Sequence, residues 1–147
     1  MLGIDIVAND LCWIGIEGNS VGGTVLLQTP PKLKFPNAAA TEFGNLASLK
    51  ELVIARLSNE RFERVGIVKA SAGATPLRAK CEFAIELACH ETRTECRLVA
   101  AQTISAAEKR KIQHTTGSSL IVAFNGGKEI QPKYLERAAT CAWCILS

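Results

Sequence analysis

The chain opens with Met1-Leu-Gly-Ile-Asp5-Ile-Val-Ala-Asn-Asp-Leu-Cys-Trp-Ile-Gly15-Ile-Glu17-Gly18, two apolar runs separated by the turn-forming residues Ala-Asn-Asp. The first run, Leu2 to Val7, contains one carboxylate, Asp5. An ionised carboxylate in an apolar interior is costly unless it is paired, hydrogen-bonded or bound to a cation. Asp5 is therefore the first candidate for chemistry in this sequence.

Length and composition limit the architecture. The 147 residues are 48% hydrophobic and 21% charged, which predicts a single domain, residues 1–147, around one core. The sequence has no apolar run of about 20 residues and no secretory leader pattern at its start, so we expect a cytoplasmic protein with no membrane partner. The net charge of +3 is too small to indicate a nucleic-acid partner by itself.

Six cysteines occur mostly beside apolar residues, where a free thiol behaves as a small hydrophobic group. Cys141 and Cys144 have the spacing of half a zinc site or of a redox pair, but no second pair has a matching spacing. We interpret this pair as packing residues and expect no disulfide bond in the chain.

Five strands are predicted from alternating or β-branched apolar runs bounded by turn residues. The first three form an antiparallel meander, and the proline-rich residues 29–37 are expected to be a loop that cannot continue the sheet. The predicted strands cover residues 2–7, 12–17, 21–28, 64–70 and 97–103.

Helices are predicted from apolar residues at helical spacing and from capping patterns. Thr75-Pro76 supplies an N-cap and a first-turn proline, and Ser105-Ala-Ala-Glu108 is read as a capping box that opens a short helix. The predicted helices cover residues 43–58, 75–90, a short segment from 105, and a terminal segment from Gln131-Pro132. Residues 115–128 are compatible with strand, helix or loop.

This order of elements, together with Gly3-Ile-Asp5 and the hairpin after it, resembles the RuvC-like branch of the RNase H-like superfamily. Residues 80–87, 99–105 and 134–143 also resemble a family of short, uncharacterised bacterial proteins with this architecture. The resemblance implies an α/β fold with a mixed five-stranded sheet in the order 3-2-1-4-5. Its three-stranded meander and two parallel strands would be flanked by helices, with Asp5 and Lys69 on adjacent strands.

Nucleases of this superfamily hold two divalent metals with acids from strand one, the end of strand four and the terminal helix. The resemblance assigns Asp5 and Glu136 to two of these positions. At the two others the chain has Lys69 and Ala139. An ammonium group at Lys69 would neutralise the carboxylates and repel Mg²⁺, which predicts a degenerate site. Other acids that could replace the missing ligands are Asp10, Glu17, Glu82 and Glu86.

Simpler interpretations exist for each candidate residue. Asp5 could cap a loop through backbone N–H groups, and Glu136 could be a solvated glutamate in the first turn of a helix. Lys69 could extend from a strand end into water. The basic run Lys109, Arg110 and Lys111 could contact nucleic-acid phosphates or form a solvated helix face.

The sequence thus predicts a degenerate nuclease domain that acts as a nucleic-acid-associated or protein-interaction module and needs no cofactor. One alternative is an active Mg²⁺-dependent nuclease with Asp5 and Glu136 as catalytic residues and metal ligands. Another is a homo-oligomeric scaffold without a nucleic-acid role, indicated by the apolar composition and the alanine-rich terminal helix.

Overall fold

The computed structural model describes residues 1–7, 10–17, 24–26, 32–34, 40–114 and 132–145, with the backbone alone for residues 24–26 and 108–114. Strands β3, β2, β1, β5 and β6 follow one another across a mixed sheet, and β4 pairs with β2 outside this path. The strands are β1 Leu2–Val7, β2 Asp10–Glu17, β3 Thr24–Leu26, β4 Lys32–Lys34, β5 Arg64–Val68 and β6 Glu95–Val99.

The sheet order is the one the sequence predicted. β1 and β2 are antiparallel, whereas β1 and β5, and β5 and β6, are parallel. The pairing of Ile4 with Ile67 places Asp5 and the end of β5 side by side at the carboxyl edge of the parallel strands. The sheet therefore brings together the first strand and a segment that comes much later in the chain.

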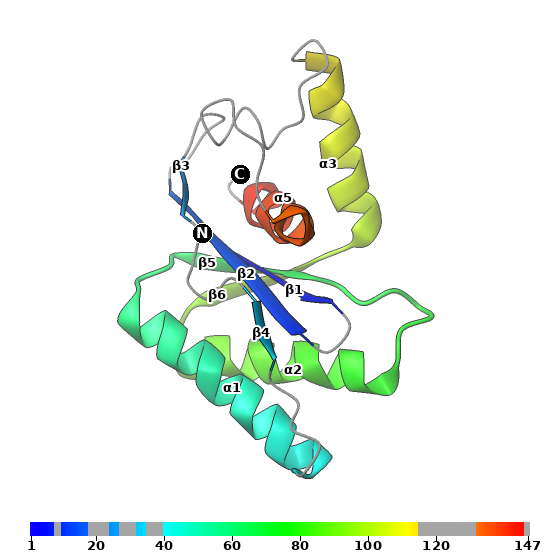
Figure 1. Cartoon of the computed structure of the whole chain (residues 1–147). Helices are drawn as coiled ribbons and strands as arrows, with labels where there is room; N and C mark the ends of the chain where they lie inside the picture. The colour runs from blue at the N-terminus through cyan, green and yellow to red at the C-terminus, as the bar shows by residue number, and fades with distance from the viewer. Residues whose placement is uncertain (8–9, 18–23, 27–31, 35–39, 115–131, 146–147) are drawn as a thin grey trace.

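Helices cover both faces of the sheet. Figure 1 shows α1 and α2 together on one face and α5 on the other, with α3 extending away from the sheet beside α5. The helical segments are α1 Glu42–Asn59, α2 Pro76–Glu91, α3 Ala101–His114, the 3-10 turn η1 Lys133–Leu135 and α5 Glu136–Cys144.

Each face has its own apolar core. Leu2, Ile4 and Ile6 of β1 pack with residues of α1 and α2, among them Leu49 and Ile85. On the opposite face the residues of β2 pack against the small residues of α5. This second cluster comprises Cys12, Ile14, Ile16, Leu135, Ala138, Ala139 and Ala142. Burial on both faces explains why β1 and β2 are apolar along nearly their whole length.

Two glycines allow α5 to lie close to the sheet. Gly3 and Gly66 are paired neighbours on β1 and β5. A Cβ atom at Gly3 would lie 1.8 Å from the carbonyl oxygen of Ala138, and one at Gly66 would lie 3.1 Å from that of Cys141. The absence of side chains at this pair sets the distance between helix and sheet.

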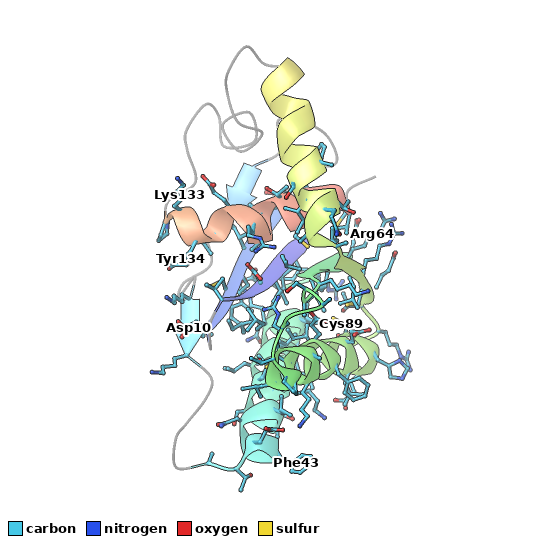
Figure 2. The ribbon with its side chains drawn as sticks, turned by 90° about the vertical axis from the view of Figure 1, so that its right-hand side faces the viewer. Asp10, Phe43, Arg64, Cys89, Lys133 and Tyr134 are labelled. Carbon is cyan, nitrogen blue, oxygen red and sulfur yellow. The ribbon has the colours of Figure 1, made fainter. Side chains whose placement is uncertain are left out.

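The proline-rich segment differs from the prediction, because it contains the short strand β4. Lys32, Leu33 and Lys34 lie between prolines and keep their own N–H groups, so they can pair with Cys12, Leu11 and Asp10 of β2. Lys32 also forms a 3.1 Å salt bridge with Asp10 and lies over the ring of Tyr134, 5.0 Å from its centroid. Figure 2 shows Asp10 and Tyr134 on the same side of the molecule.

The predicted boundary between the last strand and the helix after it was wrong. That strand, β6, ends at Val99, and α3 begins at Ala101. Ser105 and Glu108 therefore lie inside α3 instead of capping its start, because the chain leaves the sheet before the apolar run ends. Residues 115–128, for which no structure was predicted, lie outside the described residues.

The other helix predictions are confirmed. The Thr75 hydroxyl accepts a hydrogen bond from the N–H of Arg78, as expected for the N-cap of α2. All the residues predicted for the buried face of the terminal helix are buried: Leu135, Ala138, Ala139, Ala142 and Ile145. In the described part of the chain, no helix is both long enough and apolar enough to cross a membrane.

Candidate functional site

Asp5 is buried and forms an ion pair with an arginine that the sequence analysis did not consider. Its side chain is 3% exposed, and its Oδ1 accepts a 3.1 Å hydrogen bond from a terminal nitrogen of Arg78, whose side chain is 13% exposed. The same nitrogen donates to the carbonyl of Val68 at 2.7 Å, and the other terminal nitrogen donates to the carbonyl of Ile6. The guanidinium group thus joins the carboxyl ends of β1 and β5.

Glu82 completes this buried network from the next turn of α2. It is 7% exposed, and its Oε1 lies 3.7 Å from Nε of Arg78. The same oxygen accepts a hydrogen bond from the backbone N–H of Ala70, just after β5. Glu82 was considered as a substitute metal ligand, but here it holds the arginine and the loop after β5.

Asp5 also influences the thiols around it. Cys12 pairs with Asp5 across β1 and β2, and burial, followed by the negative charge of Asp5, raises the pKa of the Cys12 thiol to about 11. Burial likewise raises the pKa of the Cys141 thiol on α5, with smaller contributions from Cys144 and Asp5. Both raised pKa values reflect burial beside a carboxylate, so the thiols act as neutral packing groups at physiological pH.

A cavity of about 370 Å³ opens at this edge of the sheet. Its charged lining residues are Asp5, Lys69, Arg78 and Arg137, and its hydroxyl-bearing lining residues are Ser71 and Thr75. Lys69 is exposed, and its backbone N–H donates a 2.9 Å hydrogen bond to the carbonyl of Val99. The cavity therefore has one buried carboxylate, one buried guanidinium group and two exposed cations.

The predicted site residues are distributed unevenly around this cavity. Asp5 and Lys69 are brought together as lining residues. Glu136, the first residue of α5, is partly buried and is not among the described lining residues, whereas its neighbour Arg137 is. Ala139, at the fourth expected position, is buried in the core between α5 and the sheet.

The basic run Lys109, Arg110 and Lys111 lies within α3. The structure describes the backbone of these three residues and not their side chains. Their assignment as nucleic-acid-binding residues remains a prediction.

Signals for the overlooked residues were present in the sequence. Thr75-Pro76 fixes the start of α2, which puts Arg78 in its first turn and Glu82 four residues later, the spacing of a helical ion pair. Arg137 follows Glu136 directly in the sequence. The rotation of α5 about its axis therefore decides which of the two side chains lines the cavity. Tertiary packing sets that rotation, through Gly3 and Gly66 and through the apolar residues of β2.

Comparison with solved structures identifies the architecture. A structure of RuvC from Thermus thermophilus matches with a TM-score of 0.74 and 15% sequence identity, over 98% of this chain and 92% of that one. The chain has the RuvC-like form of the RNase H-like fold. A second structure, of T. thermophilus RuvC in complex with a Holliday junction substrate, matches the RuvC-like chain with a TM-score of 0.72 and 17% identity, over 98% of this chain and 91% of that one. No protein-family model matches the sequence, and no curated protein matches it significantly.

The residues in this RuvC-like chain do not fit a divalent metal at the position of Asp5. The carboxylate is engaged by Arg78, and a guanidinium group in contact with a ligand oxygen repels a second cation. Among the described residues, no three Asp, Glu, His or Cys side chains are grouped so that they could hold a metal ion. The geometry instead matches a carboxylate paired with an internal cation.

A second, apolar groove of about 580 Å³ lies between α1 and α2, away from Asp5. Phe43 and Phe83 line it and are 84% and 66% exposed. Phe43 lies in the first turn of α1, at the bottom of the view in Figure 2. The structure identifies no occupant for this groove. The alternatives of a protein-interaction module and a homo-oligomeric scaffold therefore remain predictions.

Proposed function

We propose that this chain is a RuvC-like domain whose nuclease site has been replaced by an ion-pair network, and that it associates with nucleic acid without cleaving it. The observation that carries the proposal is the buried contact between Arg78 and Asp5. In-line phosphodiester hydrolysis by two metals needs carboxylates that are free to bind cations. Here the strand-one carboxylate is already neutralised by the protein.

The position after β5 supports the same conclusion. Lys69 follows β5 where the resemblance calls for an acid, and Arg137 lines the cavity from α5. Both positions add positive charge beside Asp5, where a metal centre needs negative charge. The nuclease alternative would need Glu136 and a further acid to reach Asp5 past these cations.

The association with nucleic acid is proposed from the fold and the charge of the cavity together. One similar structure is of RuvC bound to a Holliday junction substrate. The cavity beside Asp5 has two exposed cations, Lys69 and Arg137, at its rim. The free thiols of all six cysteines support a location in a reducing compartment, which we propose to be the cytoplasm.

A combined cleavage and binding assay tests the proposal. End-labelled four-way DNA, duplex DNA and an RNA–DNA hybrid would be incubated with the protein in millimolar Mg²⁺ or Mn²⁺. We expect a mobility shift without cleavage, and no cleavage products from either the wild-type chain or Asp5→Asn. Asp10→Asn serves as a control on the same hairpin, because Asp10 pairs with Lys32 at the surface. Cleavage that is lost in Asp5→Asn but kept in Asp10→Asn would overturn the proposal in favour of the nuclease alternative.

A further inference from the structure

The cavity beside Asp5 has an inner and an outer part with different electrostatic roles. The inner part is the network of Asp5, Arg78 and Glu82, in which the guanidinium group contacts both carboxylates and two backbone carbonyls. One terminal nitrogen of Arg78 donates to Asp5 and Val68 and the other donates to Ile6, so Arg78 acts as an internal counter-ion. The outer part consists of Lys69 on the β5 side and Arg137 on the α5 side.

Lys69 and Arg137 are both exposed, and within the described residues neither forms a salt bridge. Their charges approach one cavity from two separate elements, the end of β5 and the first turn of α5. Ser71 and Thr75 line the same cavity from the loop before α2. Two unpaired cations facing a concave polar space favour a compact anion, and arginine is suited to a group that offers two oxygens in one plane.

We propose that this cavity binds a phosphate group directly through Lys69 and Arg137, without a divalent metal, and that the group is a phosphodiester of a nucleic-acid backbone. The inference rests on the proposed function for the source of the phosphate, but not for the chemistry of the cavity. A metal-free phosphate site replaces a bridging cation with side-chain cations. The formal charges of Arg78, Lys69 and Arg137 together exceed those of Asp5 and Glu82, so the site as a whole is positive and attracts a phosphate.

The volume of the cavity agrees with a ligand of this size. About 370 Å³ lies at the lower end of the roughly 300 to 1,000 Å³ range of small-molecule sites. Such a space admits one phosphate with its sugar and leaves the rest of a nucleic acid outside. Contacts of this kind position a backbone and carry no base sequence, so binding here is expected to be indifferent to sequence.

The test measures DNA affinity in EDTA as a function of salt, for the wild-type chain and for Lys69→Gln, Arg137→Gln and the double variant. The control is Arg61→Gln, which removes an equal charge from an exposed position before the other end of β5. We expect wild-type binding to persist in EDTA. Each cavity substitution should lower the slope of log K against log salt concentration by about one unit, and the control should leave the slope unchanged. Thermal melts of all variants confirm folding.

A second set of measurements distinguishes a nucleic-acid phosphodiester from free phosphate or a nucleotide as the ligand. Inorganic phosphate and a nucleoside monophosphate are titrated against each protein while the melting temperature is followed, and each is also used to compete with labelled DNA. Competition in the wild-type chain that is absent from the double variant supports the site. DNA binding that is equal in wild-type and double variant would overturn the inference and leave the proposed function standing.

The opposite result is also decisive. If the wild-type chain binds no nucleic acid but inorganic phosphate raises its melting temperature and not that of the double variant, the proposed function fails and the phosphate chemistry of the cavity stands. The phosphodiester assignment is then replaced by a free phosphate or a nucleotide. If neither ligand has an effect, both the proposed function and the inference are overturned.

Discussion

Arg78 is the residue on which the candidate site depends, because it joins the ends of β1 and β5 through side-chain contacts to Asp5, Ile6 and Val68. Its charge is partly buried, and much of its solvation has been replaced by protein atoms. An ion pair of this kind adds little net stability compared with apolar residues, but removing one partner leaves an uncompensated charge. The ion pair between Arg78 and Asp5 should therefore be sensitive to the removal of either partner.

Arg78→Met should lower the free energy of unfolding by about 3 to 5 kcal/mol, because it leaves Asp5 buried without a cation. The double variant Asp5→Asn/Arg78→Met should lose less, since Asp5 then carries no charge and the Glu82 carboxylate keeps its hydrogen bond from the N–H of Ala70. Urea denaturation measures the free energy of unfolding of the wild-type chain, Arg78→Met and the double variant. Arg97→Met is the surface control, because Arg97 pairs with Glu95 in solvent and should change stability by at most about 1 kcal/mol. Equal losses in Arg78→Met and Arg97→Met would show that Asp5 does not depend on Arg78 for its counter-charge.

The cysteines should differ in reactivity according to their surroundings. A hydrogen bond from the Cys89 thiol lowers the pKa of Cys96, which is partly exposed on β6. Burial raises the pKa of Cys12 to about 11 and also raises the pKa of Cys141. At pH 8 iodoacetamide should therefore alkylate Cys96 well before the other two, because the thiolate is the reacting form.

Peptide mapping by mass spectrometry measures this order. Raising the pH towards 10 should increase the Cys96 rate first, since its thiolate forms at the lowest pH, and Cys12 should remain protected until its own pKa is approached. In guanidinium chloride the difference should disappear. Alkylation of native Cys12 at the rate of Cys96 would contradict the burial of Cys12 between β2 and α5.

At the scale of elements, the position of α5 follows from the glycines beneath it and its own small residues. Ala138 and Ala142 approach Gly3, and Cys141 approaches Gly66. Close contact of helix and sheet brings the first turn of α5 to the cavity, where Arg137 is a lining residue. The close packing of α5 on the sheet therefore also places Arg137 at the cavity.

Gly3→Ala should destabilise the protein by about 3 kcal/mol, at the upper end of overpacking costs, because the new methyl group would meet the backbone carbonyl of Ala138. Gly66→Ala should cost less, since its closest contacts begin at 3.1 Å. Gly73→Ala is the matched control, because a Cβ atom there meets nothing within 4 Å. Thermal denaturation of the three variants tests the order. If Gly3→Ala were as stable as Gly73→Ala, α5 would not lie as close to β1 as described.

At the scale of the whole molecule, the chain has the RuvC-like fold, and we propose that the chemistry at its sheet edge differs from that of a metal-dependent nuclease. Two RuvC structures match nearly the whole chain at 15% and 17% identity. The same sheet order can be specified by many apolar sequences, because cores tolerate substitution when volume and pattern are kept. A site is far less tolerant, since each ligand atom has a defined charge and position.

The response of global stability to metal follows from this difference. Millimolar Mg²⁺ should leave the melting temperature of the wild-type chain unchanged, because a ligand that does not bind the folded state cannot stabilise it. Lys69→Glu alone should also be indifferent to Mg²⁺, since Arg78 still holds Asp5.

The double variant Lys69→Glu/Arg78→Met places a second carboxylate near Asp5 and removes the internal cation. It should melt at a lower temperature than wild type in EDTA and recover part of the loss in Mg²⁺ or Mn²⁺, because carboxylates that repel one another become ligands. Calorimetry with and without metal measures the recovery. A wild-type chain that melts markedly higher in Mg²⁺ would contradict the replacement of the metal site.

The sequence by itself determined the two main helices and the buried face of the terminal helix, because periodicity and capping residues act over a few neighbouring residues. The strand order came from the resemblance to RuvC-like domains. The unusual charge of Asp5 in an apolar strand made it a candidate, and its role stays a prediction. Tertiary structure alone decided which cation neutralises Asp5 and which residue of α5 lines the cavity. Arg78 lies 73 residues from Asp5 in the chain, and their contact exists only because β1 and β5 pair in parallel and α2 begins at their carboxyl ends. The strand β4 was also decided at this level, because a three-residue edge strand is stabilised by its partner β2 and has little propensity of its own.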